Sequence, residues 1–340
     1  MNAPLLLTMG DACGIGPEIS VRAWLAEASA QAPLCLVGDV AVLRRALRQC
    51  AIALPLARLQ SLDEWACVPP DCLPVWQPAG LPADLIEVPQ GRISALAGAA
   101  AVRCIEAAVA AVQAGQADGL VTAPIHKEAL HAAGVSHPGH TELLQALAAQ
   151  EGSLPPVRMM LANEELRTVL VTIHVSLREA ISLIGRERVL ETITITAAAL
   201  QRCGIAAPRI AVAGLNPHAG EGGLFGDEEL LHIAPAIAAA QALGLNVSGP
   251  YAPDTVFMRA RNAPGHPGEF DAVVAMTHDH ALIPVKYLGV EQGVNVTLGL
   301  PFVRTSPDHG TAFDIAGQGR ADVSSMRAAI RMAWQLSGAR

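Results

Sequence analysis

Residues 209–226 read Arg-Ile-Ala-Val-Ala-Gly-Leu-Asn-Pro-His-Ala-Gly-Glu-Gly-Gly-Leu-Phe-Gly, and the fold class follows from their order. The first part, Arg209–Leu215, is apolar and rich in small and β-branched residues, which predicts a fully buried strand. The eleven residues after it hold four glycines and His218. In α/β proteins ligands bind at the carboxyl ends of the strands, where glycines let the backbone approach them. The stretch therefore predicts an α/β sheet with His218 either at a functional site or capping an ordinary polar loop.

The composition of the 340-residue chain is that of a globular protein of one large or two ordinary domains. It is 51% hydrophobic, 16% charged and only 3% aromatic, which fits alanine-rich helices packed closely on a sheet. The net charge of −8, without any run of Lys and Arg, argues against a nucleic-acid partner. A small anionic substrate stays possible, because basic residues can gather locally in an acidic protein.

No segment predicts export or membrane insertion. Residues 1–9 lack the basic region of a signal peptide, and the alanine-rich stretch 95–115 contains Arg103 and Glu106. The seven cysteines include no CxxC pair, so the sequence predicts neither a disulfide framework nor a cysteine zinc site. We therefore expect a cytoplasmic protein with no membrane partner.

Apolar strands, polar or glycine-rich loops and helices alternate along the chain, which predicts an α/β/α sheet protein. The expected strands are Leu5–Met9, Leu34–Val37, Gly119–Thr122, Val157–Leu161, Arg167–Ile173, Arg209–Leu215, Ala272–Met276 and Val294–Leu298. The expected helices cover about residues 17–28, 40–50, 94–114, 141–149, 192–203, 227–243 and 323–336. Residues 55–89 hold seven prolines and are expected to be irregular, with edge strands at most. The glycines of residues 10–18 do not follow the dinucleotide-binding spacing and indicate a tight turn near a ligand, with pyrophosphate binding as the alternative.

Three histidines, His174, His218 and His278, stand just past expected buried strands. Neutral imidazoles bind borderline divalent metal ions, and a set of three leaves coordination positions open for substrate or water. Their separations of 44 and 60 residues match no local metal motif. The pattern alone therefore leaves two interpretations open, separate capping or core roles for the three histidines and a shared metal site.

Further residues could hold an anionic substrate. Arginine offers a planar fork to a carboxylate or phosphate, and lysine offers a point charge. Arg304 follows a buried strand inside an apolar segment, which argues against a purely solvated role, whereas Lys286 could equally be a surface lysine. The candidates are His140, Thr141, Lys286, Asn295 and Arg304. No nucleophile elbow and no Walker loop is present in the sequence.

Six motifs in a fixed order carry a family resemblance. They are Gly-Asp-x-x-Gly-Ile-Gly-Pro-Glu, Thr-Ala-Pro-Ile-His-Lys, Gly-His-Thr-Glu, Leu-Asn-Pro-His-Ala-Gly-Glu-Gly-Gly, His-Asp-x4-Pro-Val-Lys, and Gly-Val-Asn-Val-Thr-Leu-Gly-Leu-Pro-Phe-Val-Arg-Thr-Ser-Pro-Asp-His-Gly-Thr-Ala. Over residues 5–325 the chain resembles the 4-hydroxythreonine-4-phosphate dehydrogenase family. The longer motifs are highly specific.

The resemblance implies two α/β/α domains similar to those of isocitrate and isopropylmalate dehydrogenases, with the active site in the cleft between the domains. The first domain would comprise residues 1–128 and 295–340 and carry the cofactor loop. The second, residues 129–294, would carry the metal histidines and the dimer interface. The resemblance also implies a homodimer whose metal site is shared between subunits.

The same motifs imply roles for individual residues. His174 and His218 would bind one divalent metal, zinc or alternatively magnesium, cobalt or manganese, together with His278 of the partner subunit. The substrate would contact His140, Thr141, Lys286, Asn295 and Arg304, with Asp254 and Asp279 of the partner subunit nearby. The run His309–Gly317 resembles the adenine loop of the decarboxylating dehydrogenases. It implies NAD or NADP contacts at His309, Gly310, Thr311, Ala312 and Asp314.

The implied reaction is metal-dependent oxidation of a secondary hydroxyl by NAD(P), followed by decarboxylation. The implied substrate is 4-hydroxythreonine 4-phosphate, an intermediate of pyridoxal phosphate biosynthesis. Lys286 and Asp279 are the catalytic candidates: Lys286 would take the hydroxyl proton or bind the anionic end of the substrate.

Two departures from the family pattern bear on the substrate. Residues 277–281 read Thr-His-Asp-His-Ala where the family usually has Tyr-His-Asp-Gln-Gly, and Ala12-Cys13 stand in place of Pro-Ala. The alternatives are therefore the same chemistry on D-threonate or D-erythronate 4-phosphate, or on the cis-dihydrodiol of terephthalate. A metal-dependent lyase or hydrolase, or an anion-binding protein, is the alternative of another class, which the loop 309–317 disfavours because neither needs a dinucleotide.

Overall fold

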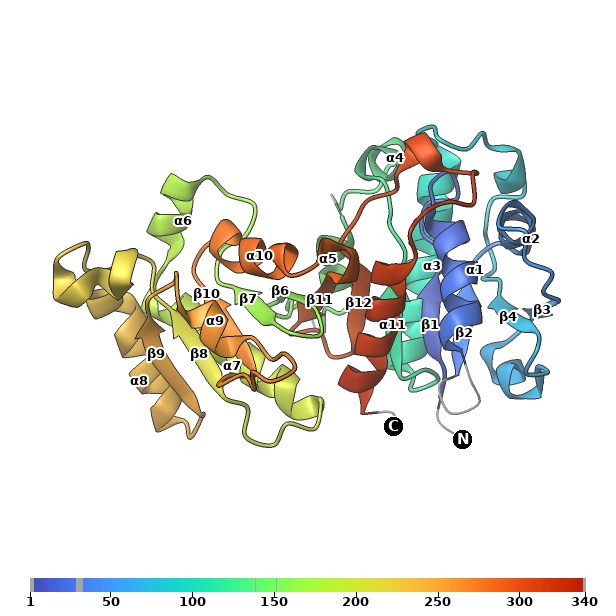
Figure 1. Cartoon of the computed structure of the whole chain (residues 1–340). Coiled ribbons are helices and arrows are strands. Elements are labelled where there is room, and N and C mark those ends of the chain that lie inside the picture. Colours follow the sequence, from blue (N-terminus) through green and yellow to red (C-terminus); the bar gives the residue numbers. More distant parts are fainter. Residues whose placement is uncertain (1–2, 29–32, 138, 151, 339–340) are drawn as a thin grey trace. The chain divides into compact units, whose positions relative to one another are not determined.

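The computed structural model describes residues 3–28, 33–137, 139–150 and 152–338, and the chain divides into two compact units. Unit 1 comprises Met1–Pro155 and Leu300–Arg340, and unit 2 comprises Pro156–Gly299. Each unit has a central sheet with helices on both faces (Figure 1). The expected α/β class with two α/β/α parts is confirmed, while the functional domain boundaries near residues 128 and 295 stay a prediction.

Unit 1 is built on a parallel sheet in the order β3-β4-β2-β1-β5-β12. The strands are β1 (Leu5–Thr8), β2 (Leu34–Val37), β3 (Leu56–Leu59), β4 (Leu73–Trp76), β5 (Gly119–Thr122) and β12 (Arg304–Pro307). The fully buried β1 pairs with β2 on one side and with β5 on the other. From β1 the chain continues to β2 on one side of it and later reaches β5 on its other side. The strand order therefore reverses between β1 and β5, and α/β proteins bind ligands outside the carboxyl ends of the strands at such a point.

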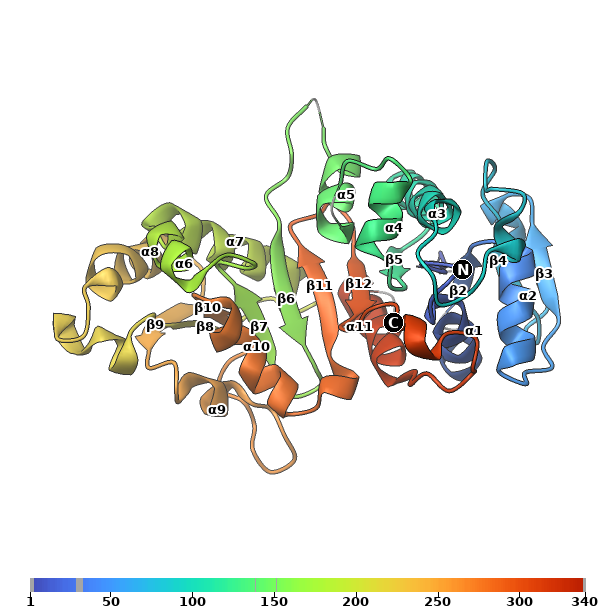
Figure 2. The same cartoon turned by 90° about the horizontal axis from the view of Figure 1, so that it is seen from above.

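The helices of unit 1 are α1 (Gly16–Glu27), α2 (Val40–Gln49), α3 (Ala95–Gln113), α4 (Lys127–Ala132), α5 (His140–Leu147) and α11 (Ser324–Ser337). Of these, α1 begins with a proline in its first turn, and α2 and α3 begin at residues whose side chains cap them. Pro17 occupies the first turn of α1, the Asp39 carboxylate accepts from Val42 N at 2.9 Å, and Ser94 Oγ accepts from Ala97 N at 3.4 Å. α1 packs against α11, and α3 packs against α4 on the opposite face of the sheet (Figure 2).

The helix α3 is long and apolar enough to cross a membrane by length and composition alone. Within the structure, 56% of its most apolar window is buried, and the helix packs on β1 and β5. Its small residues allow close approach, since Gly98 lies directly against the Ala129 carbonyl of α4. This burial is typical of a core helix in a soluble domain.

Unit 2 contains a mixed sheet in the order β11-β6-β7-β10-β8-β9. The strands are β6 (Arg158–Ala162), β7 (Arg167–Leu170), β8 (Ile210–Ala213), β9 (Val247–Tyr251), β10 (Ala272–Ala275) and β11 (Val294–Leu298). The expected pairing of the segments near residues 160 and 169 is confirmed as an antiparallel one. β7, β10, β8 and β9 are parallel, so their carboxyl ends meet at one edge. The expected buried strand after Pro208 is β8, in which every residue is buried.

The helices of unit 2 cover both faces of this sheet. They are α6 (Leu177–Leu183), α7 (Arg186–Arg202), α8 (Ala234–Ala242), α9 (Val256–Ala260) and α10 (His278–Tyr287). α7 and α8 lie on one face, and α9 and α10 on the other (Figure 2). The expected helix over residues 227–243 forms as a π-helical turn, Glu229–Ile233, that continues into α8. The helix α10 was not expected, because Pro284 within it disfavours a helix interior.

Candidate functional site

Unit 1 holds a buried positive charge beside the carboxyl end of β5. Arg304, at the first residue of β12, is only 3% exposed. Its Nε and Nη2 donate to Thr122 Oγ1 at 3.1 and 2.7 Å. Burial lowers the pKa of the Arg304 guanidinium to about 9. An anion placed here would offset the cost of taking this charge out of water.

His140 lies close enough to Arg304 for the two side chains to interact electrostatically. Burial, with the positive charge of Arg304, lowers the pKa of the His140 imidazole well below its ordinary value, so the ring is neutral at pH 7. Its Nε2 is enclosed and has no hydrogen-bond partner among the described residues. His140 and Thr141 open helix α5, whose N-terminal end favours negative charge. A buried unpaired ring nitrogen, a guanidinium and a helix N-terminus together fit an anion.

The loop that follows β12 is held against the N-terminal glycine motif. Ile15 N donates to the Thr311 carbonyl at 2.9 Å, and a Cβ at Gly14 would lie 2.8 Å from the same oxygen. The fully buried Glu18 carboxylate accepts from the backbone amides of Gly317 and Gly319. The residues implied for dinucleotide binding are therefore held in a defined loop.

The surface of this loop suits a flat ligand. The rings of His126 and Phe313 are stacked, with centroids 4.7 Å apart and an interplanar angle of 14°. Gly310 faces open space, and Ala312 is left-handed with φ of 42°. The open backbone at Gly310 is compatible with the dinucleotide contacts that the family resemblance implies. Of the five implied contacts, His309, Gly310 and Asp314 are exposed, Ala312 is partly exposed and Thr311 is buried.

In unit 2 the three candidate metal histidines follow β7, β8 and β10, which are adjacent strands. The backbone after β7 continues beside the backbone after β10, since Val171 N donates to the Ala275 carbonyl at 2.9 Å. This brings the rings of His174 and His278 to a centroid distance of 5.6 Å. His278 Nδ1 lies 2.8 Å from Asp279 Oδ1, the kind of second contact that orients a metal-binding imidazole.

His218 lies on the loop after β8 with 65% of its side chain exposed, and its Nδ1 is 3.2 Å from Glu221 Oε2. Within the described part of one chain, no group of three His, Cys, Asp or Glu side chains is placed to hold a metal ion. The donor set nevertheless fits a borderline divalent metal, because three solvent-accessible imidazoles follow the carboxyl ends of adjacent strands.

The remaining implied substrate residues lie in unit 2. Lys286 is exposed in the last turn of α10, and Asp279 is exposed in its first turn. Asp254 is exposed just before α9, and Asn295 is half-buried on β11. The structure thus brings together His140 with Arg304, and His174 with His278. The other groupings stay predictions.

Three buried residues contribute to these loops and were not singled out from the sequence. Thr122 binds Arg304, Glu18 binds the loop after β12, and Glu229 binds the loop that carries His218. Thr122 and Glu18 stand inside quoted motifs, so the motif itself was the available signal. Glu229 stands outside every motif, and its role follows only from the fold.

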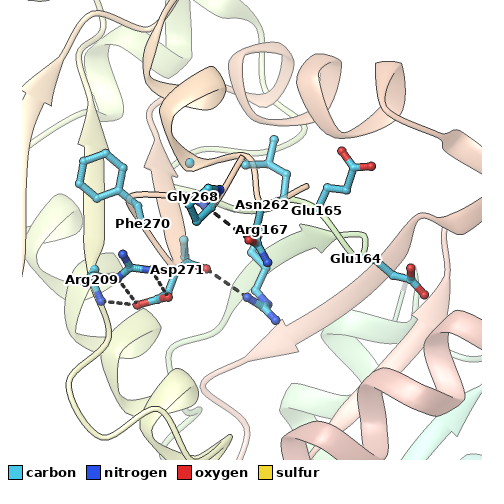
Figure 3. A pocket seen from close by; sticks show the side chains of 12 residues that line it. Glu164, Glu165, Arg167, Arg209, Asn262, Gly268, Phe270 and Asp271 are labelled. Atoms are coloured by element: carbon cyan, nitrogen blue, oxygen red, sulfur yellow. Dashed lines mark hydrogen bonds and ion pairs between the residues drawn. The ribbon is translucent and has the colours of Figure 1, made fainter. Parts of the chain in front are cut away.

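A separate cavity of about 250 Å³ lies at the opposite edge of the unit 2 sheet (Figure 3). Its lining residues lie at the amino ends of β7, β8 and β10, whereas His174, His218 and His278 follow the carboxyl ends of the same strands. Arg209 and Asp271 pair across its wall at 3.0 Å, and Arg167 donates to the Asp271 carbonyl at 3.4 Å. The residues that line this cavity include none of those predicted to bind metal, substrate or dinucleotide.

Comparison with known proteins places these features in a family. Residues 30–333 match the model of the family described as "Pyridoxal phosphate biosynthetic protein PdxA". The chain is 50% identical to 4-hydroxythreonine-4-phosphate dehydrogenase of Beijerinckia indica, over 99% of this chain and 96% of that protein. It is 42% identical to D-threonate 4-phosphate dehydrogenase of Pectobacterium atrosepticum, over 99% of this chain and all of the relative.

Solved structures agree over the whole chain. The crystal structure of 4-hydroxythreonine-4-phosphate dehydrogenase from Klebsiella pneumoniae matches with a TM-score of 0.88 and 43% identity, covering 99% of this chain and 98% of that one. A terephthalate 1,2-cis-dihydrodiol dehydrogenase from Burkholderia xenovorans matches with a TM-score of 0.69 and 31% identity, covering 99% of both chains. The identity is thus higher to relatives named for phosphorylated substrates.

Proposed function

The chain belongs to the PdxA family, and on this premise we propose that it is a dehydrogenase that oxidises and decarboxylates 4-hydroxythreonine 4-phosphate. The observation that carries the substrate class is the buried Arg304 beside the neutral His140 in unit 1. A guanidinium with this burial is best matched by a phosphate or carboxylate. Thr141, at the N-terminal turn of α5, would add a hydroxyl donor to the same group.

The cofactors of this proposal are NAD or NADP and one divalent metal, with zinc favoured by the three histidine donors. When bound, the metal would polarise the reacting oxygen of the substrate and the dinucleotide would accept hydride. His174, His218 and His278 would hold the metal. The loop residues His309, Gly310, Thr311, Ala312 and Asp314 would hold the dinucleotide.

The protein's own acid–base groups would come from helix α10 and its surroundings. Lys286 is a candidate to accept the substrate hydroxyl proton at Nζ, and in the alternative role it binds the anionic end. Asp279 orients the His278 ring through its 2.8 Å contact. Asp254 and Asn295 would contact the substrate's polar groups. A Lys286→Met variant that keeps substrate affinity but loses turnover would assign the proton role.

A homodimer is part of the proposal, and the surface of unit 2 supports it. Exposed large apolar residues stand close in sequence to the metal histidines, which is typical of a surface that a partner covers. They include Ile173, Val175, Leu177, Leu224 and Phe225. The metal site in such a dimer would be completed by donors of the partner subunit.

The second candidate keeps the chemistry and changes the substrate to D-threonate or D-erythronate 4-phosphate. The 42% identity to a D-threonate 4-phosphate dehydrogenase favours it. The departures at Thr277 and His280 suggest a pocket that differs from the family's usual one, because they flank His278, a proposed metal ligand. A terephthalate dihydrodiol has less support, since the corresponding structure is only 31% identical.

One panel of assays tests the proposal. Purified protein is incubated with Zn²⁺, Mg²⁺, Mn²⁺ or Co²⁺, with NAD or NADP, and with each of the candidate substrates, and reduced nicotinamide is followed by absorbance. We expect reduction with 4-hydroxythreonine 4-phosphate to exceed that with the threonate phosphate and the dihydrodiol. A folded, metal-loaded sample that reduces neither dinucleotide with any of these substrates would contradict the dehydrogenase proposal.

A further inference from the structure

The loop that carries His218 is backbone-strained. Residues 218–222 all have positive φ, between 43° and 76°, and together form a left-handed turn. Three of them, His218, Ala219 and Glu221, carry side chains that disfavour this region. Such conformations persist only where the surrounding structure holds them, and they concentrate at functional sites.

Glu229, in the π-helical turn that follows the loop, binds the start of the loop through its carboxylate. Its side chain is 3% exposed, and Oε1 accepts from Leu215 N at 2.7 Å and from Asn216 N at 2.8 Å. Oε2 accepts from Asn216 Nδ2 at 2.9 Å. Burial would raise the pKa of the Glu229 carboxyl, but the hydrogen bonds from Asn216 and Leu215 outweigh it and lower the pKa. The group is therefore an anion at neutral pH.

Two glycines let the loop close around this carboxylate. A Cβ at Gly214 would lie 2.9 Å from Glu229 Oε1, and one at Gly220 would lie 2.7 Å from Oε2. Any side chain at either position would displace the carboxylate from the amides it binds. Gly214 and Gly220 are thus explained by the protein carboxylate that the loop encloses.

We propose that Glu229 is a positioning residue for the proposed metal site, because its buried carboxylate fixes the backbone of Leu215 and Asn216, from which the left-handed turn leads to His218. The inference rests on the proposed function in one respect, namely that His218 is a metal ligand. The hydrogen bonds from Leu215 and Asn216 to Glu229 belong to this chain and need no bound metal. π-helical turns are often found at functional sites, and this one places Glu229 beneath the loop.

The test compares Glu229→Gln with Glu228→Gln in the full-length protein. Both variants remove one carboxylate from adjacent positions, but within the described part of the chain Glu228 accepts from Asn216 Nδ2, at 2.7 Å, and from no amide of the loop backbone. Hydrogen exchange by mass spectrometry reports the opening of residues 214–222. Competition with a chromophoric chelator gives the Kd for Co²⁺, and the visible absorption of bound Co²⁺ reports its coordination.

For Glu229→Gln we expect at least tenfold faster exchange of residues 214–222, at least tenfold weaker Co²⁺ binding and a changed Co²⁺ spectrum. Glu228→Gln should stay within about threefold of the wild type in each measurement. Wild-type Co²⁺ affinity and spectrum in Glu229→Gln would overturn the inference, and so would weaker binding with unchanged exchange. If the wild type binds no metal, the proposed metal site fails, while the exchange data still decide whether Glu229 holds the loop.

A second variant covers the case in which Glu229→Gln does not fold. Ala219→Gly relieves strain at a left-handed position without removing a hydrogen bond, because glycine adopts φ of 55° without steric cost. We expect several-fold slower exchange of residues 214–222 and Co²⁺ binding at least as tight as in the wild type. Faster exchange of residues 214–222 in this variant would show that the loop is not strained at Ala219. The Glu229 carboxylate would then have no strained turn to hold in place, and the inference would be overturned.

Discussion

Arg304 keeps a guanidinium almost fully out of water, and its hydrogen bonds to Thr122 Oγ1 fix the orientation of the fork. Arg304→Lys should keep a positive charge but lose the paired donors that match phosphate oxygens. We expect the KM for the phosphorylated substrate to rise at least tenfold, equivalent to about 1.4 kcal/mol of binding. Inorganic phosphate should also raise the Tm of the variant less than that of the wild type. Arg103→Lys, at an exposed ion pair on α3, is the matched control and should change neither value.

The pH dependence of anion binding follows from the same burial. Because the pKa of Arg304 is lowered to about 9, the free protein loses this charge as the pH rises through 9. We expect phosphate affinity to be highest below pH 8 and to fall above pH 9, measured by calorimetry at constant ionic strength. Bound anion favours the charged form, so phosphate binding near pH 9 should be accompanied by proton uptake. Affinity that stays constant from pH 7 to pH 10 would contradict the assignment.

His140 makes stability depend on pH in the acidic range. The pKa of His140 is lowered well below its usual value of about 6.5, first by burial and then by Arg304. Below pH 6.5 the unfolded chain therefore binds a proton that the folded chain does not, and the free energy of unfolding falls, by at most about 1.4 kcal/mol per pH unit. His140→Asn should flatten this slope between pH 6.5 and 5 in denaturant titrations. His131→Asn, at an exposed position on α4, should leave the slope unchanged.

At the scale of elements, helix α1 connects the N-terminal motif to the loop after β12. Glu18, in its first turn, binds two loop amides, whereas Glu27, in its last turn, pairs with Arg327 and Arg331 of α11. Glu18→Gln replaces one acceptor oxygen with a donor that faces a backbone N–H. We expect its Kd for NAD(P) to rise at least tenfold, measured by quenching of protein fluorescence, while phosphate binding at Arg304 is unchanged.

Glu27→Gln is the control on the same helix. It should lower the Tm because it weakens the packing of α1 on α11, but it should leave the dinucleotide Kd within about twofold of the wild type. If both variants weaken dinucleotide binding equally, the effect of Glu18 is on the stability of α1 and not on the loop.

The regular elements were predictable where burial and local sequence agree. Leu34–Val37, Gly119–Thr122 and Val294–Leu298 are strands at the bounds expected from their apolar runs. The helix α10 could not be expected, because Pro284 argues against it locally and only its packing on β7 and β10 favours it. Tertiary packing thus decided the elements on which local propensity was ambiguous.

For the candidate site, candidate positions can be predicted from the sequence, but the contacts that support them cannot. Histidines after strands can be read from the sequence, because strand ends are where parallel sheets place function. The carboxylate that supports each loop cannot, since Glu18 and Gly317 are 299 residues apart and meet only in the fold. For Glu229 the separation from Asn216 is short, yet the buried geometry depends on a π-helical turn without a sequence signal.

The proposed metal site raises the question of which subunit supplies each of its three histidines. The rings of His174 and His278 lie 5.6 Å apart in one chain, which allows both to come from the same subunit. The family resemblance implies instead that His278 reaches the site of the partner.

Hybrid dimers decide between these arrangements. His174→Ala and His278→Ala chains, with different affinity tags, are co-expressed and the hybrid is purified through both tags. If His174 and His218 of one subunit act with His278 of the other, one of the two sites in the hybrid has all three histidines, and the second lacks two. For the hybrid we therefore expect about half of the wild-type activity and one tightly bound metal per dimer. Each mutant homodimer should be inactive and should bind no metal tightly. If all three ligands come from one subunit, both sites in the hybrid lack a histidine, and a hybrid as inactive as its parents would contradict a shared site.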